Sequence, residues 1–215
     1  MLIAATRVRA QNVTVTISPR KQPLQPRARA TVEAILEAAA HILESRGLAG
    51  YNTNAVAERA GVSIGSLYQY FPGKDAVMAA LIRRETALLL AEAETAGTFP
   101  GAREGLIQLI NAAVRHQLRR PVLARLIDGE EVRLPLDADN RGIEATMTDL
   151  VADILRRPGV PRAANRTVAA RDLVAIVKGM VDAAGIREER DEMALARRVR
   201  AAVFGYLDRL DTSLS

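Results

Sequence analysis

The sequence predicts an all-α protein of about nine helices. Ala, Leu and Arg dominate its 215 residues, and aromatic residues make up only 3% of them, a composition that favours helices over sheets. Apolar residues recur three and four positions apart in one segment after another, which is the spacing of a single helix face. Short breaks that contain glycine or proline separate these segments. We therefore expect helices that are joined by short loops and bury their apolar faces against one another.

The first helix is expected over about residues 28–45. Its apolar residues fall at i, i+1, i+4, i+7 and i+8 counted from Ile35, which places them on one face. Gly47 follows as a suitable stop. His41 lies off the apolar face and is therefore expected to be exposed.

Two short helices joined by a tight turn follow, over about residues 53–60 and 63–70. Gly61 between them supplies a positive φ at little steric cost. Asn52 and Ser63 are the expected N-caps, because their side chains can accept from free backbone N–H groups of the first turn. An apolar residue before each cap and another inside the helix form a hydrophobic staple. This arrangement suits a helix-turn-helix that places its second helix in a DNA major groove, although a hairpin in any helical bundle is the alternative.

Aromatic residues gather at the end of the second short helix, where Tyr68, Tyr70 and Phe71 precede a further helix that begins near Lys74. Tyrosine hydroxyls and a lysine at a helix N-terminus are suitable partners for phosphate groups. A purely structural hairpin has no need of such a cluster. The cluster therefore favours DNA binding.

The helix that begins near Lys74 is expected to reach about residue 96. Asp137 or Asp139 is the expected N-cap of the seventh helix, which Pro158 follows. The other helices are expected at about residues 102–119, 121–128, 166–184 and 190–210, with a loop at residues 130–135.

The run from Gly47 through AVAERAGVSIGSLYQYFPGK resembles the DNA-binding domain of the TetR family of bacterial transcriptional regulators. The spacing from Gly47 to Gly61, the AGVS turn, the LYxYF end and the following lysine all match, over about residues 29–83. The resemblance implies a helix-turn-helix domain with its connecting helix at residues 27–96. It also implies a ligand-binding and dimerisation domain at residues 97–215. The implied function is that of a homodimeric repressor, released from a palindromic operator in double-stranded DNA by a small-molecule effector.

The family's motif assigns two groups of DNA contacts. Residues expected to bind phosphates are Thr53, Ser63, Tyr68, Tyr70 and Lys74. Residues expected to read bases are Asn54, Ile64, Gly65, Ser66 and Gln69. Gln69 can pair with adenine through two hydrogen bonds, and Ile64 can meet a thymine methyl group. Because the set contains no arginine, we expect weak direct reading of guanine.

The last two helices are expected to pair with their copies in a four-helix dimer interface, as the resemblance implies. Gly179 and Gly205 lie within these helices and permit close helix approach. The alternative is that both apolar stripes face only the chain's own core. The candidate interface residues are Ile176, Met180, Leu195, Val199, Val203 and Tyr206.

A ligand pocket is expected among the fourth to eighth helices. Its walls should be mainly aliphatic, because few aromatic residues follow Phe99, so a small apolar effector is favoured over a flat aromatic one. His116 can give the pocket one polar group, although a structural histidine is the alternative. The candidate pocket residues are Leu109, Ala113, His116, Met147 and Met180.

The positive charge is concentrated at the N-terminus. The net charge is +5, yet the first 30 residues hold six basic residues (Arg7, Arg9, Arg20, Lys21, Arg27 and Arg29) and no acidic one. We therefore interpret residues 1–26 as a basic, proline-containing arm placed directly before DNA-binding helices. For residues 1–17 a solvated tail is the alternative, and residues 11–17 alternate weakly enough to suggest a short strand.

Other classes of protein find little support in the sequence. No cysteine is present, which excludes a thiolate zinc site and fits a reducing cytoplasm. No apolar run approaches the roughly 20 residues that span a membrane. The two histidines fall in different predicted helices and no catalytic motif is present, so we expect no enzyme, no cofactor and no bound metal. A DNA-binding architectural protein without an effector remains the alternative to a regulator.

Overall fold

The computed structural model describes residues 17–20, 25–161 and 165–211, and within these ranges it contains nine α-helices and no strand. The suggested strand at residues 11–17 lies almost entirely outside the described residues, as do Arg7, Arg9 and Lys21. The helices are α1 (Pro26–Gly50), α2 (Thr53–Ala60), α3 (Ile64–Tyr70), α4 (Lys74–Ala96), α5 (Ala102–Arg119), α6 (Pro121–Arg133), α7 (Asp137–Ile154), α8 (Arg166–Ile186) and α9 (Glu192–Asp211).

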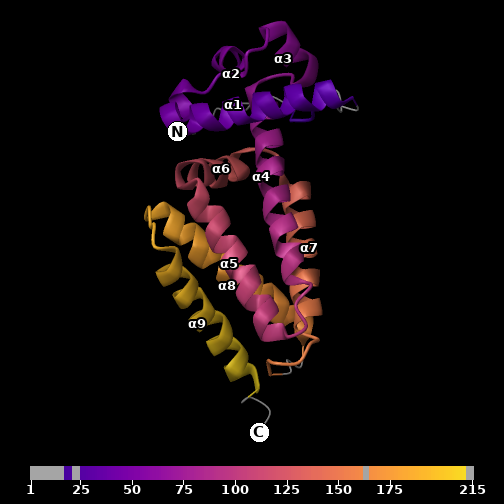
Figure 1. The fold of residues 1–215 in the computed structure, drawn as a ribbon, viewed down its shortest axis with the longest axis vertical. Coiled ribbons are helices and arrows are strands. Elements are labelled where there is room, and N and C mark those ends of the chain that lie inside the picture. The colour runs from indigo at the N-terminus through magenta and orange to yellow at the C-terminus, as the bar shows by residue number, and fades with distance from the viewer. Residues whose placement is uncertain (1–16, 21–24, 162–164, 212–215) are drawn as a thin grey trace, which may run out of the picture.

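The helices form two bundles that α4 connects. Figure 1 shows α1, α2 and α3 together at one end, and α4 running from them into a longer bundle of α5 and α7–α9. Each bundle has its own apolar core. Residues from the first half of α4, such as Leu81, belong to the first core, and Ala93 and Ala96 belong to the second. A displacement of α4 would therefore be felt in both bundles.

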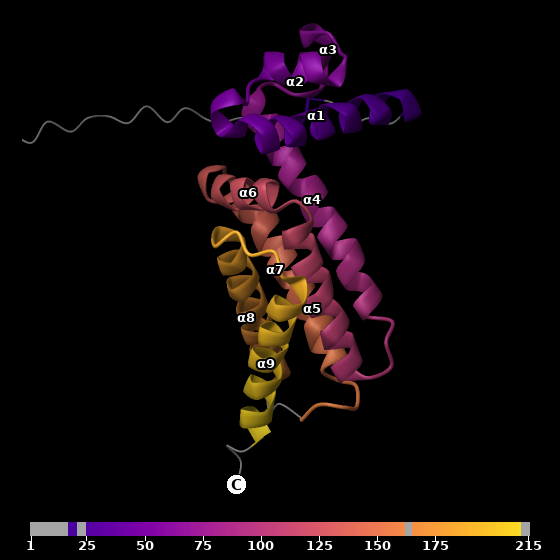
Figure 2. The same cartoon turned by 60° about the vertical axis from the view of Figure 1, so that its left-hand side comes forward.

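The short helix α6 belongs to the first core although it follows α5 in the chain. Leu123 and Ile127 of α6 are buried there, together with Leu134 and Leu136 just beyond the helix. Figure 2 shows α6 lying between the α1–α3 bundle and the ends of α5 and α8. The sequence places α6 in the second domain, but its apolar face packs against the first.

The expected end of the first helix coincides with a kink. Gly47 has φ 62° and ψ −167° inside α1, and a final helical turn continues beyond it to Gly50. Glycine adopts this positive φ readily because it has no Cβ. The predicted stop is therefore the position at which the helix changes direction.

The predicted loop at residues 130–135 begins too early, because α6 continues to Arg133 and only the last two of these residues lie outside the helix. Glu130 is buried in the last turn and accepts from Arg133 at 2.6 Å, and Arg133 also binds Asp75 of α4 at 2.5 Å. Ion pairing between residues three positions apart supports a helix. The Glu130–Arg133 pair is local, whereas the Arg133–Asp75 contact joins distant parts of the chain and leaves no local signal in the sequence.

The predicted cap of the seventh helix was also wrong. Asp137 and Asp139 lie in the first turn of α7, and Leu136 occupies the cap position without a side-chain hydrogen bond. Asp139 instead forms an ion pair with Arg83 of α4 at 2.7 Å. Acidic residues in a first helical turn still suit the helix dipole.

Helix α8 continues past its expected end at residue 184, through Gly185 to Ile186. Gly185 is buried, and a Cβ at this position would lie 2.3 Å from Nε2 of Gln117 on α5. The glycine therefore permits two helices to approach closely. None of the helices in the described ranges is long and apolar enough to cross a membrane.

Candidate DNA-binding face and ligand cavity

Side-chain caps and a glycine turn fix the helix-turn-helix as the sequence predicts. Gly61 ends α2 with φ 67° and ψ 28°, the left-handed region. The N–H of Ala55 donates to Oδ1 of Asn52 at 3.0 Å, and the N–H of Ser66 donates to Oγ of Ser63 at 3.0 Å. Leu67 is completely buried beneath α3. Its burial holds α3 with the opposite face turned to solvent.

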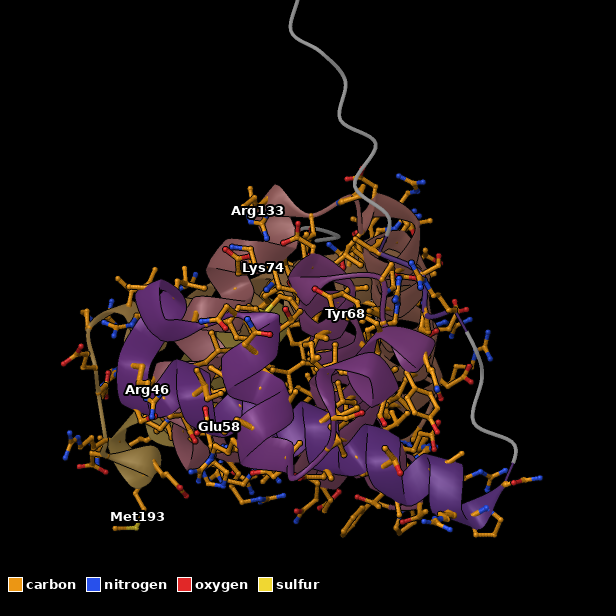
Figure 3. All side chains as sticks on the ribbon, turned by 90° about the horizontal axis from the view of Figure 1, so that it is seen from above. Arg46, Glu58, Tyr68, Lys74, Arg133 and Met193 are labelled. Atoms are coloured by element: carbon orange, nitrogen blue, oxygen red, sulfur yellow. The ribbon has the colours of Figure 1, made fainter. Side chains whose placement is uncertain are left out.

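Most of the predicted phosphate contacts lie together on the outer face. Oγ1 of Thr53 and the hydroxyl of Tyr68 are 3.3 Å apart, which joins the start of α2 to α3. Lys74 is exposed at the start of α4, and Figure 3 shows it on the same face as Tyr68. Ser63 is exposed, whereas Tyr70 is half-buried against the first core. Tyr70 therefore offers less side-chain surface to DNA than the sequence suggests.

The predicted base readers are mostly exposed. Asn54, Ile64, Gly65 and Gln69 face solvent, while Ser66 is half-buried and its hydroxyl lies 2.8 Å from that of Ser63. Because its side chain is half-buried and its hydroxyl already bonds that of Ser63, Ser66 is the weakest candidate of the set. The exposed members form a surface that a major groove can accept.

The N-terminal arm brings an arginine to this face that the motif does not include. The backbone N–H of Arg20 donates to the carbonyl of Tyr70 at 2.8 Å, and its Nη1 donates to the carbonyl of Tyr68 at 3.2 Å. Arg20 lines a shallow groove together with Gly65, Tyr68 and Gln69. The only signal in the sequence was its place in the basic arm.

A cavity of about 420 Å³ lies among helices α4 to α8. Four of the five predicted pocket residues line it: Leu109, Ala113, His116 and Met147. Met180 does not, because its half-buried side chain packs against the second core. Among the residues that the structure describes, no Phe, Tyr or Trp lines the cavity. This agrees with the expected scarcity of stacking surfaces.

The cavity wall is more charged than the sequence suggests. Asp128 and Glu131 of α6 line it together with Lys178 and Asp182 of α8, and Lys178 donates to Asp182 at 2.7 Å. Burial raises the pKa of both Asp128 and Glu131, and neighbouring carboxylates add to the rise. The expectation of one polar group in an aliphatic wall was therefore wrong. Residues far apart in the sequence bring their charges together here.

His116 presents a buried nitrogen without a partner. Nδ1 of His116 is inaccessible to solvent and has no hydrogen-bond partner among the described residues. Burial lowers the pKa of His116, so the imidazole is neutral at neutral pH. A neutral imidazole has one N–H donor and one acceptor nitrogen, so Nδ1 can either donate or accept one hydrogen bond, depending on the tautomer.

Arg120 connects the cavity to the DNA-binding bundle. Its side chain lines the cavity and also pairs with Glu37 and Glu44 of α1, at 3.0 and 2.6 Å. The hydrogen bond from Arg120 holds the pKa of Glu44 below its ordinary value. The same guanidinium therefore lies at the cavity and at the interface between the bundles.

Three of the predicted dimer residues lie inside the chain's own core. Leu195 and Val199 are completely buried and Val203 is 1% exposed within one protomer. They cannot reach a partner, so their assignment to an interface was wrong. Ile176 and Tyr206 are half-buried, as is Met180, and the Tyr206 hydroxyl donates to Asp172.

The opposite faces of α8 and α9 remain open. Gly179, Ala201 and Gly205 are exposed, and a Cβ at either glycine would meet nothing within 4 Å. Figure 2 shows α8 and α9 side by side on one side of the long bundle. Across the described ranges, no group of His, Cys, Asp or Glu side chains could hold a metal ion.

Comparison with known proteins agrees with this arrangement. The sequence model of bacterial regulatory proteins of the TetR family matches residues 35–81, and that of the tetracyclin repressor-like C-terminal domain matches residues 103–207. An uncharacterised HTH-type transcriptional regulator of Mycobacterium tuberculosis, Rv1255c, is 28% identical over 165 residues. That alignment covers 76% of this chain and 80% of the relative.

Solved structures share the fold. The fatty acid degradation regulator FadR from Bacillus halodurans has a TM-score of 0.66 at 17% identity, covering 81% of this chain and 95% of that one. A putative TetR-family regulator from Mesorhizobium loti has a TM-score of 0.67 at 18% identity, covering 86% and 98%. SmeT, solved in complex with triclosan, has a TM-score of 0.59 at 24% identity, covering 80% and 90%. Taken with the exposed helix-turn-helix, the two matched domains identify this chain as a member of the TetR family, a DNA-binding transcriptional regulator.

Proposed function

We propose that this protein is a homodimeric repressor that releases a palindromic operator when a small amphipathic molecule enters the cavity. One observation carries the proposal: Arg120 lines the cavity and binds Glu37 and Glu44 in the DNA-binding bundle. An occupant of the cavity can therefore change a contact that positions α1. Since α1 packs against α2, such a change would reach the recognition helix.

Two copies of the helix-turn-helix would bind one operator. Lys74, Tyr68 and Thr53 would contact phosphates and set the register, while Gln69 and Ile64 would read base edges in the major groove. A single seven-residue recognition helix offers few base contacts, so tight and selective binding requires a second half-site. Half-sites about one helical turn, roughly 34 Å, apart are the geometric expectation.

The dimer would form through the outward faces of α8 and α9. Gly179 on α8 and Gly205 on α9 are exposed, with Ile176 and Ala201 beside them on their respective helices. Small residues allow helix backbones to approach, and a Cβ at either glycine would meet nothing within 4 Å. We place a four-helix interface here, on the face opposite to the buried stripe of α9.

The effector would combine an apolar body with a basic group. Leu109, Ala113 and Met147 provide an apolar wall. Burial raises the pKa values of Asp128 and Glu131, and Lys178, which opposes the rise, is itself paired with Asp182 at 2.7 Å. A bound cation would stabilise their ionised forms. Triclosan is the molecule solved with the structural neighbour SmeT, and we propose a different, basic class for this chain because of its carboxylates.

The release mechanism would be a shift of populations. The effector would favour a dimer whose recognition helices no longer match successive major grooves, and α4 and Arg120 would transmit the change. Only a difference in effector affinity between the two dimer states can drive such a shift.

A panel of alkylamines tests the proposal, with the alcohol and the carboxylate of equal chain length as matched controls. Operator duplex, first obtained by selection from random DNA, should be released by an amine at lower concentration than by its controls. Asp128→Asn combined with Glu131→Gln should abolish the preference for the amine. If no compound of the panel releases the operator, an architectural protein without an effector is favoured. If the carboxylate releases it, the proposed positive charge of the effector is contradicted.

A further inference from the structure

We propose that Arg20, which precedes the first helix, reads a guanine next to the base pair that Gln69 contacts. The inference deepens the proposed function and rests on its DNA-binding face. It concerns a residue outside the residues 35–81 that the TetR family's DNA-binding domain covers. It therefore describes a feature of this chain beyond the shared helix-turn-helix.

The backbone fixes Arg20 against the recognition helix. Its N–H donates to the carbonyl of Tyr70 at 2.8 Å, so the chain at residue 20 is attached to the last residue of α3. The carbonyl of Ile17 accepts from Nη1 of Arg83 at 3.4 Å. Arg83 is itself held by Asp139 at 2.7 Å. Residue 17 is thus anchored to α4, and residue 20 is anchored to α3. The position of the Arg20 side chain therefore follows from these backbone contacts.

The side chain of Arg20 lies on the base-reading side of α3. It shares a shallow groove with Gly65, Tyr68 and Gln69. Gly65 and Gln69 are four positions apart and share one helix face. Gly65 also contributes no side chain, and a Cβ there would meet only the Ser63 hydroxyl, at 3.8 Å. The groove therefore leaves space for a base edge beside the guanidinium.

The guanidinium retains donors for DNA. Nη1 donates to the Tyr68 carbonyl at 3.2 Å, whereas Nε and Nη2 have no partner among the residues that the structure describes. A guanidinium has five N–H donors in a planar fork, which matches O6 and N7 of guanine. The hydrogen bond to Tyr68 would orient this fork before DNA binds.

The recognition helix itself lacks this chemistry. The sequence of α3, IGSLYQY, contains no basic residue. Gln69 suits adenine, and Ile64 suits the thymine methyl group. Without a basic group, α3 alone would discriminate poorly in favour of guanine. Arg20 supplies the missing cation from the preceding arm.

Binding-site selection from random duplex DNA tests this assignment with full-length wild-type protein, Arg20→Ala and Arg20→Lys. Arg46→Ala is the charge-matched control, since Arg46 lies at the far end of α1 and Figure 3 shows it well apart from Tyr68. Binding of each variant is then measured on the selected site and on versions that change one base pair. Wild type should prefer guanine at one position of each half-site by about 5- to 150-fold over other bases.

Arg20→Ala should lose this preference while the preferences at other positions remain. Arg20→Lys should restore binding strength more than preference, because lysine keeps the charge without the planar fork. Arg46→Ala should leave the profile unchanged. If Arg20→Ala weakens binding to all sequences equally, the base-reading role is overturned and a phosphate contact is indicated. If Arg20→Ala changes neither the base-preference profile nor the affinity, Arg20 makes no contact with DNA. Failure of wild type to enrich a sequence would instead contradict the proposed function, and the role of Arg20 with it.

Discussion

Arg120 and Glu44 join the two helical bundles through a pair of parallel hydrogen bonds, from Nε to Oε1 at 2.8 Å and from Nη2 to Oε2 at 2.6 Å. The side chains of the pair are only 21% and 26% exposed. Two-pronged pairing between a guanidinium and a carboxylate fixes orientation as well as distance. Because Arg120 also lines the cavity, this pair is a direct physical connection between the cavity and the DNA-binding bundle.

Replacement of Arg120 should weaken both stability and communication. Arg120→Met removes the hydrogen bonds to Glu44 and Glu37 and should lower the free energy of unfolding by about 1.5–3 kcal/mol, the range for hydrogen bonds to charged groups. Arg125→Met is the matched control, because Arg125 pairs with Glu188 at the surface and should cost at most about 1 kcal/mol. Denaturant unfolding measures both variants. If both variants lose the same free energy of unfolding, the Arg120–Glu44 pair stabilises the protein no more than a surface ion pair does.

His116 should make the protein sensitive to mild acid. Burial lowers the pKa of His116 below 6.5, so the unfolded chain binds a proton at higher pH than the folded one. Stability should therefore fall as the pH drops below about 6.5 toward the folded pKa. His116→Leu removes this loss and the unpartnered Nδ1, and should raise stability by about 1 kcal/mol at pH 7.

Thermal unfolding of His116→Leu and wild type across pH 5–8 checks this effect. The exposed His41 provides the control: His41 faces solvent beside Glu37 and Glu44, and His41→Leu should not reproduce the result. Parallel pH profiles for wild type and His116→Leu would contradict the buried, neutral state.

Gln69 and Lys74 should affect DNA binding in different ways. Gln69→Ala should cost about 1–3 kcal/mol on the best site and flatten the preference at one base pair. Lys74→Ala should weaken binding to all sequences alike and reduce the slope of log affinity against log salt by about 1. Fluorescence anisotropy at several salt concentrations separates the two. An unchanged preference profile in Gln69→Ala would mean that α3 is oriented differently on the DNA.

A charge at Gly179 should separate dimerisation from folding. Gly179 is exposed and a Cβ there meets nothing within 4 Å, so Gly179→Arg should keep the fold and gain about 0.5–1 kcal/mol of helix propensity. At the proposed interface, however, the arginine would be buried without a partner, which is costly. Sedimentation should show a folded monomer.

Gly142→Arg is the matched control for this variant, because Gly142 is an equally open helical glycine on α7. It should sediment as wild type does. A stable dimer of Gly179→Arg would place the interface elsewhere on the molecule.

Local patterns predicted the fold well where local interactions decide it. The caps at Asn52 and Ser63, the turn at Gly61 and the start of α4 at Lys74 all follow from rules about adjacent residues, and each is confirmed. The continuation of α6 through Glu130 was missed: the local Glu130–Arg133 pair supports it, but the contact of Arg133 with Asp75 of another helix has no local signal. Contacts between distant segments leave no local periodicity.

Residues of the candidate sites were likewise predicted where a local motif determines them, and missed where distant contacts do. The outward positions of the helix-turn-helix follow from the motif, but the approach of Arg20 to α3 depends on backbone hydrogen bonds of an arm that has no motif. The apolar stripe of α9 was identified and assigned to the wrong surface. Periodicity indicates that Val199 faces something apolar, but it does not distinguish the chain's own core from a partner.

The claim that the cavity and the DNA-binding face are coupled is tested most directly by calorimetry. The alkylamine that releases DNA at the lowest concentration is titrated into free protein and into protein saturated with the selected operator duplex. We expect weaker amine binding in the presence of operator, by the same factor by which the amine weakens operator binding. Equal amine affinity in the two titrations would contradict it.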